Sequence, residues 1–91
     1  MTTFNLTENE TRALEVLYKS CLDNMGGNCI EDLKNDPFTW CDASDLIDAG
    51  WSKHEAAGTY GALIEKSVVW PDEEGDCLSM EAAEFIAAFI D

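Results

Sequence analysis

The sequence predicts a small, mainly helical α+β domain, with four or five helices and a small β element of two or three strands. Apolar residues recur at helical spacing in three segments, and a capping signal stands before each. A β-branched and aromatic run also precedes a cluster of turn residues, as in a hairpin. Because 91 residues suit one domain with one modest core, residues 1–91 are expected to fold as a single unit.

The first helix is predicted to begin after Thr7 and to end at Gly26 and Gly27. Thr7 and Glu10 have the spacing of a capping box, in which each side chain binds the backbone amide of the other residue. Glycine ends helices because it readily adopts the left-handed conformation. Between these signals the apolar positions repeat at intervals of three and four residues: Leu14, Leu17, Tyr18, Cys21, Leu22 and Met25.

The segment that follows predicts only short elements. Asn28 can cap a helical turn that reaches Leu33, and Pro37 disfavours helix at Asp36 before it. Residues 38–41 are aromatic and β-prone, and they are interpreted as a short strand.

Two further helices are predicted between residues 42 and 66. The first begins at Asp42 or Ser44 and is closed by Gly50. The next opens with Ser52 and Glu55, which form a second capping-box pattern, and extends to about Lys66. Its inward side chains are expected to be Ala56, Tyr60, Leu63 and Ile64.

The last third of the chain predicts a hairpin and a final helix. Residues 68–70 are β-branched and aromatic, residues 71–76 have turn composition, and residues 77–78 can return as a short paired strand. Ser79 is the expected cap of the last helix. The face of that helix expected to be buried carries Ala82, Phe85, Ile86, Phe89 and Ile90.

This order of elements resembles a winged helix-turn-helix domain of the broad MarR or ArsR type, over roughly residues 38–90. The densest part of the resemblance is "ASDLIDAGWSKHEAAGTYGALIEKSVV", where Gly50, Trp51 and Ser52 match the tight turn between the two central helices. The resemblance implies that the third helix is the recognition helix and that the hairpin is the wing. The chain departs from the family at Ser67, where a glycine is usual, and in its long connection over residues 26–37.

Charge is the extreme feature of the composition. Nineteen acidic residues face five Lys and Arg, which gives a net charge of -14 and a pI near 4.1. A field of this sign repels nucleic acids and anionic membranes and attracts basic surfaces. The simpler interpretation is that the acidity only keeps a small protein in solution.

The positions that would touch DNA carry few cations. By the resemblance, the outward face of the third helix consists of Lys53, His54, Ala57, Gly58 and Gly61, whereas base readout requires side chains such as Arg, Lys, Asn or Gln. The small residues on this face either pack closely against the first helix or form a flat docking surface. The wing normally brings cations to phosphates, but the corresponding positions here are the carboxylates Asp72, Glu73, Glu74 and Asp76.

Motifs for catalysis or metal binding are not found in the sequence. The cysteines at 21, 29, 41 and 77 include no Cys-x-x-Cys pair, and a calcium loop counted from Asp72 would need Gly at 77 and Glu at 83. We therefore predict a non-enzymatic protein with no catalytic residue, no cofactor and no metal. The absence of a secretory leader or a membrane-length apolar run predicts a cytoplasmic protein that does not enter a membrane.

The leading functional hypothesis is an acidic module that binds a protein partner with a basic surface. In size and charge the chain resembles phage or mobile-element products, some of which act as DNA mimics or anti-CRISPR or anti-restriction inhibitors and occupy the nucleic-acid groove of a host protein. The alternatives are a winged-helix regulator that binds DNA as a dimer, and a homodimeric assembly module. Either a monomer or a homodimer is compatible with the sequence. The predicted partner-binding residues are Asp42, Asp45, Asp48, Lys53, His54, Ala57, Gly58, Gly61, Asp72, Glu73, Glu74 and Asp76.

Overall fold

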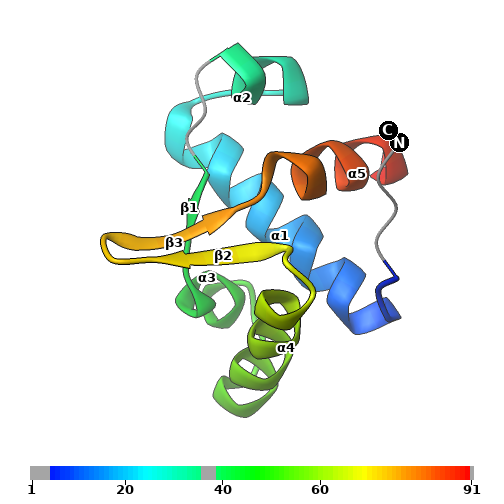
Figure 1. Cartoon of the computed structure of the whole chain (residues 1–91), viewed down its shortest axis with the longest axis vertical. Helices are drawn as coiled ribbons and strands as arrows, with labels where there is room; N and C mark the ends of the chain where they lie inside the picture. The colour runs from blue at the N-terminus through cyan, green and yellow to red at the C-terminus, as the bar shows by residue number, and fades with distance from the viewer. Residues whose placement is uncertain (1–4, 36–38, 91) are drawn as a thin grey trace.

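The computed structural model describes residues 5–35 and 39–90, which form five helices and a three-stranded antiparallel sheet (Figure 1). This confirms the predicted α+β class. The predicted break at Asp36 and Pro37 and the start of the first strand at Phe38 lie outside the described residues. In chain order the elements are α1 (Glu8–Met25), α2 (Ile30–Asn35), β1 (Trp40–Cys41), α3 (Ala43–Asp48), α4 (Lys53–Glu65), β2 (Val69–Asp72), β3 (Gly75–Leu78) and α5 (Met80–Ile90).

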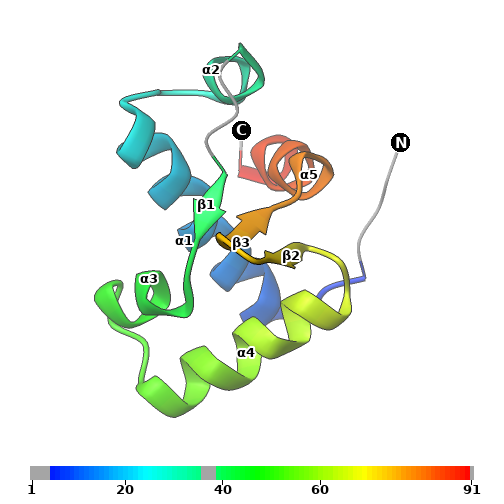
Figure 2. The ribbon, with the colours of Figure 1, turned by 60° about the vertical axis from the view of Figure 1, so that its left-hand side comes forward.

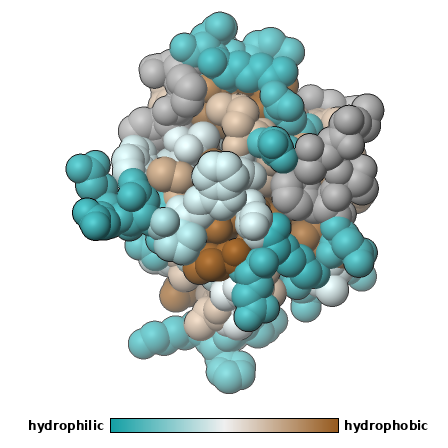
Figure 3. Space-filling view, viewed as in Figure 1, coloured by the Kyte–Doolittle hydropathy of each residue, from teal (hydrophilic) through white to brown (hydrophobic). Residues whose placement is uncertain are grey.

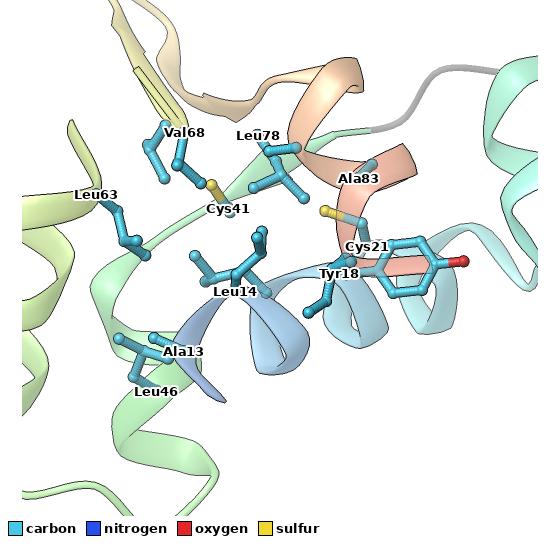
Figure 4. Packing of buried hydrophobic residues seen from close by; sticks show 14 of the residues in the cluster. Ala13, Leu14, Tyr18, Cys21, Cys41, Leu46, Leu63, Val68, Leu78 and Ala83 are labelled. Carbon is cyan, nitrogen blue, oxygen red and sulfur yellow. The ribbon is translucent and has the colours of Figure 1, made fainter. Parts of the chain in front are cut away.

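Helix α1 runs through the middle of the molecule, and α3, α4, α5 and β1 all contact it (Figure 2). Its predicted apolar stripe is confirmed, because Leu14, Leu17 and Cys21 are fully buried. Leu46 of α3 and Leu63 of α4 are also fully buried in the same core, which Figure 4 shows from close by. Every large element therefore depends on one helix for its packing.

Both ends of α1 form as predicted. The hydroxyl of Thr7 accepts the amide of Glu10 at 3.2 Å, the Glu10 carboxylate accepts the amide of Thr7 at 2.9 Å, and Gly26 ends the helix with φ 75°. The same carboxylate accepts a hydrogen bond from Lys66 at 2.5 Å, and this bond is the main cause of the lowered pKa of Glu10. The start of α1 is thereby tied to the residue that follows α4.

Helices α3 and α4 start at the predicted caps. Asp42 and Asp45 form a complete capping box at α3. At α4 only half of the predicted box forms: Ser52 accepts the amide of Glu55 at 3.1 Å, but the Glu55 carboxylate accepts the Ser52 hydroxyl instead of a backbone amide. The prediction that the Glu55 carboxylate binds the Ser52 amide is therefore wrong, although the cap itself is present.

The sheet has the strand order β1-β3-β2, with β3 antiparallel to both neighbours. The predicted turn over residues 71–76 is too long, because Pro71 pairs with Asp76 and Asp72 pairs with Gly75. Only Glu73 and Glu74 connect the strands. Proline is tolerated in β2 because β2 is an edge strand, where a missing amide donor is harmless if it faces away from the ladder.

Helix α5 is capped as predicted, since Ser79 accepts the amide of Ala82 at 3.1 Å, and Ala82 and Ile86 are buried as predicted, but the rest of its buried face differs. Phe89 is 67% exposed, and Phe85 and Ile90 are only partly buried. The buried side chains are Ala82, Ala83, Ile86 and Ala87. The side of α5 that faces α1 is therefore centred on these three alanines and Ile86, and Phe89 falls outside it.

The connection from α4 to β2 requires an unusual backbone conformation at Ser67. Its φ is 63°, and it is the one non-glycine residue in the described chain with a positive φ. Glycine adopts this conformation without a Cβ clash, whereas serine does not. The backbone at Ser67 is therefore strained by its side chain.

We predict that Ser67→Gly raises the free energy of unfolding by about 0.5–1 kcal/mol, because removing Cβ relieves the left-handed strain by more than glycine's extra chain entropy costs. Urea unfolding followed by circular dichroism measures the change. Ser67→Ala is the matched control and should give no gain, because alanine keeps Cβ. Equal stability of the glycine and alanine variants would contradict the account.

Candidate protein-binding surfaces

The hairpin tip consists of Asp72, Glu73 and Glu74, and all three residues are exposed. The Asp72 carboxylate accepts the amide of Glu73 at 2.8 Å, which helps to order the two-residue turn. In Figure 3 the end of the hairpin is a hydrophilic lobe that projects from one side of the molecule. The predicted wing acids are therefore brought together at a projecting, solvent-facing point.

Asp76, the fourth predicted wing acid, has an internal role. Its carboxylate accepts the phenol of Tyr60 at 2.6 Å, and the phenol also lies 3.4 Å from the Cys41 carbonyl. Burial, followed by this hydrogen bond to Asp76, raises the pKa of Tyr60 well above its ordinary value. The bond joins α4 to β3, so Asp76 holds the hairpin in place as well as contributing charge.

The acids of α3 lie on a second surface. Asp42 and Asp45 bind amides at the start of the helix, and Asp48 is exposed near its end. Asp45 and Asp48 also line a groove of about 530 Å³ between α1 and α3, together with Asp23 of α1. Cys41 pairs with Asp76, so the chain enters α3 directly from the sheet that carries the hairpin.

The outward face of α4 is smooth, as predicted. Lys53, His54, Ala57 and Gly58 are exposed, and Gly61 is half-buried. A Cβ built on Gly58 or Gly61 would meet no atom within 4 Å, so the interpretation that these glycines permit close packing against α1 is wrong. Their use as part of a docking surface stays a prediction.

Most of the few basic side chains are already paired. Lys19 lies 3.6 Å from Glu15, Lys34 lies 3.5 Å from Glu84, and Lys66 binds Glu10. The five basic residues of the chain therefore offer little positive charge for contacts with phosphates. The exposed hairpin tip, in contrast, carries carboxylates only.

The outer face of the sheet was not predicted as a site, yet it exposes two tryptophans. Trp40 and Trp70 pair with Cys77 from opposite sides, so the three residues form one row across the strands. The side chains are 38% and 57% exposed, respectively. The available sequence signal was a repeated Trp-x-Asp pattern, at residues 40–42 and 70–72, which places a ring and a carboxylate on the same side of an extended chain.

The buried thiols and the half-buried thiol of Cys77 are poor nucleophiles. Burial raises the pKa of both Cys21 and Cys41 to about 12, and it also raises the pKa of Cys77. They stay protonated near neutral pH and are weak nucleophiles. Within residues 5–35 and 39–90, no three His, Cys, Asp or Glu side chains gather closely enough to hold a metal ion. No helix in the same part of the chain has the length and apolar character needed to cross a membrane.

Comparisons of the chain with protein-family models, with curated proteins and with solved structures gave no match.

We predict that Tyr60→Phe lowers the free energy of unfolding by about 1.5–3 kcal/mol at pH 7, because a half-buried carboxylate loses its donor. The folded-state pKa of Tyr60 is raised, so its stabilising contribution is complete below pH 10, the ordinary tyrosine value, and is lost as the pH rises further. Urea unfolding of the parent protein and of Tyr60→Phe at pH 7 and pH 11 measures the difference between their free energies of unfolding. A difference that does not become smaller at pH 11 would show that the phenol is not the group responsible.

Proposed function

We propose that the domain has the winged-helix arrangement. In its support, the helix pair α3 and α4 leads directly into the β2-β3 hairpin, and β1 joins the sheet beside β3. The left-handed conformation of Ser67, at the family's usual glycine position, is consistent with the same arrangement. In this scheme α4 takes the place of the recognition helix, and the hairpin tip is the end of the wing.

We further propose that the protein is a non-enzymatic module that binds the basic, nucleic-acid-binding surface of another protein, as a DNA mimic or inhibitor does. The observation that carries the proposal is the exposed hairpin tip, where a DNA-binding wing would need cations and this chain has Asp72, Glu73 and Glu74. The net charge of -14 extends the same preference over the whole molecule.

Direct DNA binding fits this surface poorly. Phosphate contacts supply most of the affinity of DNA-binding proteins, and each contact needs a cation or another donor. On the outward face of α4, the cationic residue is Lys53, beside His54 and the small residues Ala57, Gly58 and Gly61. The elements on either side of α4 in the chain, α3 and the β2-β3 hairpin, contribute carboxylates and no Lys or Arg.

The mechanism is charge complementarity. Exposed carboxylates at the hairpin tip and on α3 take the place of nucleic-acid phosphates against Lys and Arg of the partner. Such a field accelerates association at low ionic strength and weakens as salt screens it. Binding by this mechanism excludes nucleic acid from the same surface, which is how a mimic inhibits.

We predict that the triple change Asp72→Lys, Glu73→Lys and Glu74→Lys abolishes capture of basic partners. The test is affinity capture with the immobilised chain from a nuclease-treated bacterial lysate. Proteins retained by the unmodified chain should be nucleic-acid-binding proteins that short duplex DNA releases. Asp76 is left intact in this variant, because its bond to Tyr60 supports the fold.

The matched control reverses three exposed glutamates elsewhere, with Glu8→Lys, Glu65→Lys and Glu81→Lys, so the net charge changes by the same amount. This control should retain partners. Any decrease in the amount captured should be no larger than its smaller net negative charge accounts for. Equal loss in both variants would mean that net charge, not the hairpin tip, decides binding. Capture of basic partners by the variant with lysine at positions 72, 73 and 74 would contradict the proposed site.

A further inference from the structure

The two exposed tryptophans are arranged by the sheet. Trp40 and Trp70 both pair with Cys77, and residues that pair directly across strands share a face of the sheet. The two tryptophans therefore stand on the same face, on either side of Cys77. Two strand spacings separate their backbones by about 10 Å. Figure 3 views this face, where a surface of intermediate hydropathy lies over the strands beside the hydrophilic end of the hairpin.

Contacts with the sheet and the preceding turn hold both rings in place. The indole of Trp70 donates a hydrogen bond to the Ser67 carbonyl at 2.8 Å. The ring of Trp40 lies against Gly75, where an added Cβ would come within 3.2 Å of the ring atom Cε3. Rings that are already fixed lose little conformational entropy when a partner covers them, which favours their use as anchors.

The two rings have different surroundings. Gly75, which lies under Trp40, pairs with Asp72, so the register puts Asp72 at the strand position beside the residue that carries the Trp40 ring. Trp70 instead walls a largely apolar groove of about 430 Å³ that continues along Cys77 and Leu78 to Met80. Lys34 also lines this groove, and its ammonium lies 3.5 Å from the Glu84 carboxylate. One end of the face thus combines an aromatic ring with negative charge, and the other accepts an apolar side chain.

We propose that the outer face of the sheet binds a partner segment that presents an arginine next to an apolar residue. The guanidinium stacks on Trp40 and pairs with Asp72, while the apolar side chain enters the groove beside Trp70. A flat guanidinium suits both a ring face and a carboxylate, which a lysine ammonium matches less well. The proposal rests on the proposed function, because it names where and how a basic partner docks.

Peptide binding followed by tryptophan fluorescence tests this docking mode. The protein carries Trp51→Phe, so that the emission comes from Trp40 and Trp70, and the probes are hexapeptides of alternating Arg-Leu, Lys-Leu and Arg-Ser at low salt. We expect the Arg-Leu peptide to bind about threefold or more tightly than either of the others. Trp40→Leu and Trp70→Leu keep apolar bulk and remove a ring face. Each should weaken Arg-Leu binding about three- to fivefold, measured by calorimetry.

The controls separate docking from folding and from general attraction. Circular dichroism checks that each variant is folded, and Asp72→Asn offers a milder change that leaves both rings in place and should also weaken Arg-Leu binding. Phe89→Leu alters an exposed aromatic residue on α5, away from the sheet, and should leave binding unchanged. Weakening by Phe89→Leu equal to that by the tryptophan variants would overturn the assignment of the surface.

The remaining outcomes distinguish this inference from the proposed function. If the Arg-Leu and Lys-Leu peptides bind equally and the tryptophan variants change nothing, the outer face is not the docking site, although a basic partner is still bound. If no basic peptide binds at low salt, the proposed function fails as well. Light scattering that shows a dimer for the parent chain and a monomer for Trp70→Leu would mean that a second copy covers this face, and it would overturn the proposal.

Discussion

The fold depends on the burial of one face of α1. A chain of 91 residues can support only one core, and α3, α4, α5 and β1 all reach that core through contacts with this helix. Leu14 and Leu17 are completely buried at its centre. A change that exposed this face would therefore release the helices and the sheet together, since no described element outside α1 makes extensive contacts with all of them.

Outside this single core, the charge of the chain is mostly of one sign. Like charges repel one another in the folded state, and this chain offsets part of that repulsion by pairing its scarce cations internally. The bond between Lys66 and Glu10 also joins the beginning of α1 to the end of α4. Tyr60 similarly joins α4 to the sheet through Asp76. The polar contacts that stabilise the fold thus leave the hairpin tip as an unneutralised acidic surface.

Local signals predicted the elements that short-range chemistry determines. The capping box at Thr7, the glycine after Met25 and the cap at Ser79 each involve neighbours within a few residues, and each was confirmed. The class of the fold followed from these signals and from the spacing of apolar positions.

Two local expectations were wrong, namely the reciprocal bond at Ser52 and the length of the turn over residues 71–76. The other errors involve contacts between distant residues. The outward position of Phe89 depends on which side of α5 packs against α1, and apolar periodicity did not identify that side correctly. The bond between Tyr60 and Asp76 joins residues 16 positions apart, and the tryptophan row requires the register of three strands. The acidic hairpin tip could be predicted because it is a continuous stretch of sequence. The Trp-x-Asp repeat marks the two tryptophans of the outer face of the sheet, but it does not give the strand register that brings them together.

The proposed function requires that this domain engages basic proteins and not nucleic acid. Fluorescence anisotropy of a labelled 20-base-pair duplex of mixed sequence, titrated with the protein at low salt, distinguishes the two. We expect no change in anisotropy at micromolar protein, because the phosphates meet carboxylates and few cations. A salt-sensitive rise in anisotropy at micromolar protein would contradict it and would indicate a DNA-binding regulator instead.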